Sequence, residues 1–118
     1  MRKISETILD FGRPLLDLYD QPPTIAAMKN TLTFIIAVWD AHVMATKPWG
    51  KPQYLEAMRK QCCESLIGAR MMELLSHRWH EFFSNDFRVV ATWDIVPDGK
   101  GGHQFQCDAR WPGTPGTA

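Results

Sequence analysis

The chain has 118 residues, 45% of them hydrophobic and 22% charged, which is the size and composition of one folded domain rather than of a disordered or multidomain protein. Thirteen basic residues balance thirteen acidic residues, so no net field would attract a phosphate backbone or an anionic membrane surface. Nucleic acid and membrane are therefore not the expected partners.

Export and disulfide formation are not expected either. The N-terminal segment MRKISETILDFG reaches Glu6 and Asp10 before any apolar run long enough for a signal peptide. The most apolar window, residues 31–39, is far shorter than the roughly 20 residues that span a bilayer. The chain has three cysteines, Cys62, Cys63 and Cys107. Their odd number and their spacing predict reduced thiols in a cytoplasmic protein, with a redox sensor as the alternative.

Helical periodicity dominates the chain as far as residue 84. Four helices are expected, at 5–18, 24–45, 53–63 and 66–84. Ser5 and Thr24 are the candidate N-caps of the first two, and Gly12 with Pro14 predicts a kink in the first. The last helix should bury one apolar face, formed by Ile67, Met71, Leu74, Leu75, Trp79 and Phe82. Gly68 either separates the last two helices or lies within one longer helix.

Beyond the helices the apolar period changes to 2, which is typical of strands. Alternation over 87–95 and 103–111 flanks PDGKGG at 97–102, a turn sequence, so a β-hairpin with one apolar and one polar face is expected. The apolar face should contain Val89 and Ala91 of the first strand. The sequence therefore predicts a single α+β domain over 1–111, a bundle of four or five helices followed by a C-terminal antiparallel β-hairpin packed on the helices, and a flexible tail at 112–118.

An isolated hairpin is marginally stable in water and has two open edges. Either a helix covers an edge, or two hairpins of a homodimer join into one sheet. Val90 and Val96 interrupt the polar face, which favours a homodimer formed through the hairpin edge or through the helices. The candidate interface residues are Arg88, Val90, Thr92, Gln106, Asp108 and Arg110.

The stretch VWDAHVMATKPWG, residues 38–50, contains the most suggestive side chains. Asp40 and His42 are two residues apart on a helix and so point about 200° away from each other, which excludes a dyad. A helical projection places Asp40 on a narrow polar strip, where it should be solvated. It places His42 in the apolar arc, where the ring should be buried and bonded to another element. The available partners are Asp10, Asp17, Tyr19 and Asp86.

Trp49 lies in a loop between Pro48 and Pro52 that should hold the ring at a defined position. The ring either closes the core at the end of the second helix, which we favour, or forms an exposed binding platform. The candidate binding residues are Trp39, His42, Trp49 and Trp93. A catalytic base or a pH-sensitive switch is the alternative role of His42.

Chemistry-bearing motifs are otherwise weak. Glu73, His77 and His80 follow one side of a helix at spacings of four and three, but that side is opposite the apolar face and lacks the HExxH order of zinc proteases. A solvated face is the favoured interpretation. The chain has no nucleophile elbow, phosphate-binding loop or dinucleotide glycine pattern, so we expect no metal, no cofactor and no catalytic residue.

Three segments, ISETILDF, WDAHV followed by WG, and FFSNDFRVVATWDIVPDGKGGHQFQCDAR, resemble a family of small bacterial accessory-genome proteins that share a tryptophan, histidine and hairpin pattern. The resemblance implies a stand-alone accessory protein carried on mobile elements and transfers no activity. The predicted function is a non-enzymatic homodimeric interaction module or small-ligand-binding module. The alternatives are an enzyme that uses His42 as a base with a carboxylate from another helix, and a nucleic-acid-binding accessory protein.

Overall fold

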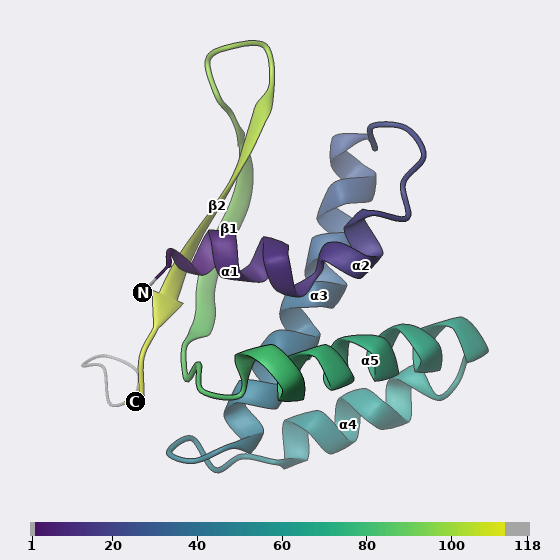
Figure 1. The fold of residues 1–118 in the computed structure, drawn as a ribbon, viewed down its shortest axis with the longest axis vertical. Helices are drawn as coiled ribbons and strands as arrows, with labels where there is room; N and C mark the ends of the chain where they lie inside the picture. The colour runs from purple at the N-terminus through teal and green to yellow at the C-terminus, as the bar shows by residue number, and fades with distance from the viewer. Residues whose placement is uncertain (1, 113–118) are drawn as a thin grey trace.

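A computed structural model describes residues 2–112 of the chain. The elements are α1 (Ile4–Phe11), α2 (Arg13–Leu16), α3 (Ile25–Ala45), α4 (Gln53–Cys62), α5 (Leu66–Arg78), the π-helical turn η1 (Trp79–Phe83), β1 (Val89–Pro97) and β2 (His103–Arg110). The predicted α+β fold, helices followed by a hairpin, is confirmed (Figure 1). No helix within this described part is long and apolar enough to cross a membrane. Of the predicted tail, all but Pro112 lies outside the described residues.

Gly12 divides the first helical segment, as predicted, and brings it close to α3. A Cβ atom at Gly12 would lie 2.5 Å from Cδ1 of Ile35, so a larger residue would push the two segments apart. Thr24 caps α3 by accepting the N–H of Ala27 at 3.1 Å. The Ser5 cap is wrong: α1 begins at Ile4 and has no side-chain cap.

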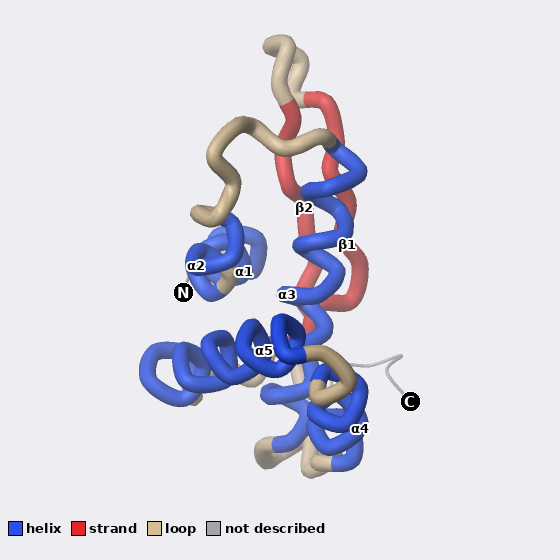
Figure 2. Tube along the Cα trace, turned by 90° about the vertical axis from the view of Figure 1, so that its right-hand side faces the viewer, coloured by secondary structure: helices blue, strands red, loops and turns tan. Residues whose placement is uncertain are grey.

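Helix α3 is the central element of the core, with the hairpin along one side and α4 and α5 packed on its C-terminal half (Figures 1 and 2). Trp39 makes edge-to-face contacts with Phe11 of α1 at 5.2 Å and with Phe83 of η1 at 5.6 Å between ring centroids. Burial of one large aromatic against rings from two other elements fixes α3 between them.

Helices α4 and α5 are separate, because Ser65 caps α5 by accepting the N–H of Gly68. The apolar face predicted for α5 is partly wrong. The buried residues of α5 and η1 are Met72, Leu75, Trp79 and Phe83, whereas Ile67, Leu74 and Phe82 are exposed. This segment is apolar on two sides, and its contacts with α3 and α4 bury only one of them.

The hairpin pairs β1 with β2 and contains a bulge between Val90 and Thr92. The bulge shifts the alternation by one residue. Ala91 is therefore exposed, and Val90, expected on the polar face, packs against the core instead. Helix α3 contacts β1 and α1 contacts β2 (Figure 2), so helices pack against both strands, while the turn of the hairpin extends past them (Figure 1).

Candidate functional site between α4 and α5

His42 is buried, as predicted, with 1% of its surface exposed. Its ring stacks on Trp79 at 5.2 Å between centroids and meets the edge of His80 at 5.4 Å. Its Nε2 atom is hydrogen-bonded to Oγ of Ser76 on α5 at 2.7 Å. The buried imidazole thus has a hydroxyl partner on a neighbouring helix.

The partner expected for His42 was wrong. Asp10 binds Arg78, Asp86 binds Arg88, and Tyr19 is bonded to Thr31. Asp17 is exposed. The expectation considered mainly carboxylates, whereas a neutral ring is satisfied by a hydroxyl that can both donate and accept.

The environment keeps His42 uncharged. Burial lowers the pKa of His42 to about 4, and the neighbouring His80 and Arg59 act in the same direction. The ring is therefore neutral at neutral pH, and either it or Ser76 can donate the shared hydrogen.

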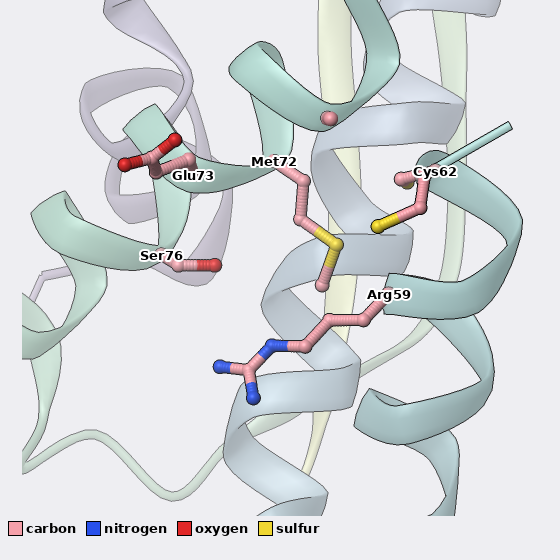
Figure 3. A pocket seen from close by; sticks show the side chains of 7 residues that line it. Arg59, Cys62, Met72, Glu73 and Ser76 are labelled. Carbon is pink, nitrogen blue, oxygen red and sulfur yellow. The ribbon is translucent and has the colours of Figure 1, made fainter. Parts of the chain in front are cut away.

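A pocket of about 300 Å³ lies between α4 and α5, on the side of α5 that carries Ser76 (Figure 3). Its lining residues are Arg59, Cys62, Cys63, Ala69, Met72, Glu73 and Ser76. Met72 and Ser76 extend from α5 toward α4, and Arg59 extends from α4 toward the Ser76 hydroxyl (Figure 3). Ser76 therefore connects the buried His42 with an open pocket.

The thiols of this region are free. Burial raises the pKa of Cys62, and the adjacent Cys63 adds to the effect. Burial likewise raises the pKa of Cys107, on the hairpin, to about 11. A raised pKa disfavours the reactive thiolate, which argues against Cys62 or Cys107 as a redox sensor.

The helical face with Glu73, His77 and His80 does not converge on one point. His77 pairs with Glu81 at 3.2 Å, on the exposed surface, while His80 packs against the His42 ring. Within residues 2–112 no group of three or more His, Cys, Asp or Glu side chains is arranged to hold a metal ion.

Asp40, expected in solvent, lies instead at the interface between α3 and the hairpin. Its carboxylate accepts the backbone N–H of Val90 at 2.8 Å. Burial raises the pKa of Asp40 to about 7, although the Val90 N–H and the charge of Arg110 oppose the shift. The helical projection failed here because β1 packs on the polar strip of α3.

The four candidate binding residues do not meet in one pocket. The indole N–H of Trp39 donates to the Arg88 carbonyl at 2.8 Å, and Trp39 is fully buried. The indole N–H of Trp49 donates to the Phe87 carbonyl at 2.7 Å, so this ring closes the core, as favoured. Trp93 packs against Phe105 within the hairpin. Only His42, through Ser76, reaches the pocket between α4 and α5.

The candidate interface residues are divided between two environments. Thr92, Gln106 and Asp108 lie on the exposed face of the hairpin, and Arg110 is half-buried beside Trp49. Arg88, expected on the polar face, is 4% exposed, and its guanidinium binds Asp86, the Arg2 carbonyl and Thr7. Arg88 thus links the start of β1 to α1 rather than facing a partner.

Ser76 and Arg59 were not singled out from the sequence. One signal was present: Ser76 lies one residue after Leu75 and three before Trp79, so it is a hydroxyl beside the buried face of its helix. A small polar residue there is the expected complement of an inward histidine.

Comparison of the chain with protein-family models, with curated proteins and with solved structures gives no match. The function is therefore argued from the geometry of the pocket.

Proposed function

We propose that the protein is a non-enzymatic small-ligand-binding module whose site is the pocket between α4 and α5. The ligand class is a small molecule with one anionic head group on a short apolar body. The observation that carries the proposal is the Ser76 hydroxyl, which lines the pocket and is oriented by the buried ring of His42.

The head group is inferred from Arg59 and Ser76. A guanidinium binds carboxylates through two parallel hydrogen bonds, and Arg59 and Ser76 line the same pocket. Neutral His42 orients the hydroxyl without adding a charge of its own. Glu73, also in the lining, opposes the binding of a polyanion.

The apolar body is inferred from the rest of the lining, because Cys62, Ala69 and Met72 offer small and adaptable apolar contacts. A volume of about 300 Å³ is at the low end of the range for small-molecule sites. Hexanoate, one carboxylate on a short alkyl chain, represents this class.

The test is a titration of the protein with hexanoate followed by amide chemical shifts in two-dimensional NMR spectra. We expect the shifts to cluster in residues 59–63 and 69–76. Arg59→Gln and Ser76→Ala should each weaken binding by about tenfold or more, the effect of losing a hydrogen bond to a charged group. Lys60→Gln, a substitution at the exposed neighbour of Arg59 on α4, outside the pocket lining, is the matched control. Shift changes elsewhere, or equal affinity of Arg59→Gln and the wild type, would refute the proposal.

A hydrolase with Ser76 as nucleophile and His42 as base is a second candidate, favoured by the 2.7 Å Nε2–Oγ contact. The low pKa of His42 makes it a weak base, which is why ligand binding is preferred. The test is hydrolysis of p-nitrophenyl acetate with Cys63→Ser as background, since an exposed thiol also reacts with this ester. Turnover that is abolished by Ser76→Ala and by His42→Gln would establish the hydrolase; unchanged rates would eliminate it.

Cytoplasmic location, bacterial origin and carriage on mobile elements stay predictions, as does self-association.

A further inference from the structure

We propose that the outer side of α5, together with an apolar groove beside it, forms an isologous interface with a second copy of this chain. This surface is distinct from the ligand pocket. The pocket residues Ala69, Met72 and Ser76 and the outer residues Ile67 and Leu74 lie on different sides of one helix.

The outer side of α5 and η1 exposes large apolar side chains in a row. Ile67 is 72% exposed, Leu74 47% and Phe82 63%. Ile67 and Leu74 are seven residues apart, two helical turns, and therefore share one face. A row of this kind on one helix is typical of a face covered by another helix.

A groove of about 360 Å³ continues this row toward α2 and α3. Its lining residues are Leu15, Leu18, Tyr19, Asn30, Thr31, Phe34 and Met71. Met71 joins the two parts, because it lies one turn from both Ile67 and Leu74 on α5. Leu18 is 71% exposed at the groove, and it is a projecting side chain that a matching hollow could receive.

Charge complementarity identifies the occupant as a second copy. Arg70, on the outer side of α5, and Asp17 and Asp20, beside Leu18, are exposed and form no ion pair within residues 2–112. A two-fold axis that places α5 of one copy on the α2 end of the other brings Arg70 to these carboxylates twice. The zero net charge of the chain adds no repulsion between copies.

The exposed apolar side chains also favour an interface on the helices. Homodimerisation was expected through the hairpin edge or through the helices. Both strands pack against helices, β1 against α3 and β2 against α1, whereas Ile67, Leu74 and Phe82 are exposed on α5 and η1.

The test is sedimentation velocity over a range of protein concentrations. We expect the wild type to pass from monomer to dimer as concentration rises and Leu74→Glu to stay monomeric. Arg70→Asp should weaken the dimer by at least tenfold. Asp17→Arg with Asp20→Arg should do the same, and the triple variant should recover the wild-type affinity, because reversing both charges restores the pair.

The control is Gln106→Glu on the exposed face of the hairpin, which should dimerise like the wild type. A wild type that is monomeric throughout the range, or a dimer that survives Leu74→Glu, would overturn the proposal, and so would a dimer that dissociates with Gln106→Glu. A triple variant as weak as Arg70→Asp would also overturn the charge pairing that defines it.

Discussion

The two sides of α3 bury titratable groups in different ways. On the hairpin side, where α3 meets β1, Asp40 accepts a main-chain N–H and its pKa is raised to about 7. On the α5 side, where α3 meets α5 and η1, His42 bonds to a side-chain hydroxyl and its pKa is lowered to about 4. Burial disfavours the charged form of both groups, so it moves the two pKa values in opposite directions.

The two sides also differ in the groups that bond across them. The indole N–H groups of Trp39 and Trp49 donate to two consecutive main-chain carbonyls, of Arg88 and Phe87, immediately before β1. The indole N–H of Trp79, stacked on His42, is buried without an acceptor in the described residues; on the hairpin side, Nε of Arg110 is the corresponding exception. The hairpin side is thus bonded through main-chain groups, whereas the α5 side leads through the Ser76 side chain to a pocket. Four substitutions test this difference.

The largest effect should come from Arg88 on the hairpin side. Arg88→Ala leaves the largely buried Asp86 carboxylate without its partner, so it should lower the free energy of unfolding by about 3–5 kcal/mol. Urea unfolding measures the loss. Arg13→Ala, which removes an exposed ion pair, should change stability by less than about 1 kcal/mol. A loss for Arg88→Ala as small as that of its control would show that Arg88 does not hold the hairpin on α1.

Asp40→Asn should remove a pH dependence of the free energy of unfolding that arises on the hairpin side. Between about pH 4 and pH 7 the folded wild type keeps the Asp40 proton while the unfolded chain has lost it, so stability falls as pH rises through this window. Each pKa unit corresponds to about 1.4 kcal/mol. The variant keeps an acceptor for Val90 and should be more stable than the wild type above about pH 7, with the difference shrinking toward pH 4.

Asp94→Asn is the control for that measurement. The N–H of Ile95 and then Lys29 lower the pKa of Asp94, so its charge stabilises the fold above the ordinary value of 3.8, and the variant should be slightly less stable at neutral pH. Urea unfolding at several pH values shows whether each variant is more stable or less stable than the wild type. A constant difference between Asp40→Asn and the wild type would mean that Asp40 is not the titrating group.

His42→Gln should reveal the opposite pH dependence of stability on the α5 side. As pH falls from 6.5 toward about 4, the unfolded wild type gains a proton on His42 that the folded protein does not, so its stability falls. Glutamine does not titrate. The variant should be less stable than the wild type at neutral pH because stacking on Trp79 is lost, and the gap should narrow as pH falls. A gap that is independent of pH would indicate that folding does not lower the pKa of His42.

Ser76→Ala should have the smallest effect on stability, about 1 kcal/mol in urea unfolding, because one hydrogen bond to His42 is lost. Ser76→Ala should weaken hexanoate binding by about tenfold or more, which is about 1.4 kcal/mol and therefore more than its effect on the free energy of unfolding. Cys63→Ala, an exposed substitution in the same pocket, should leave stability unchanged within about 0.5 kcal/mol. If Ser76→Ala were as harmless as this control, the hydroxyl would not be the partner that the buried ring requires.

The sequence alone determined the order and type of the elements. Gly12, the Thr24 cap and PDGKGG act locally, through backbone conformation and nearby hydrogen bonds, so their effects could be read without knowing the fold. The inward direction of His42 followed from the period of α3 for the same reason.

Only the tertiary structure decided which surface covers which. Asp40 was expected in solvent and Arg88 on the polar face of the hairpin, because a helical projection and strand alternation place polar residues on outer faces. The hairpin packs on Asp40 instead, and the Arg88 side chain binds groups in and beside α1. The α5 helix has two apolar sides, and packing selected the one that contains Leu75 and Trp79. Ser76 became the partner of His42 by the same choice, across 34 residues of sequence. Such contacts depend on how whole elements pack against one another. The periodicity within one element carries no information about that packing.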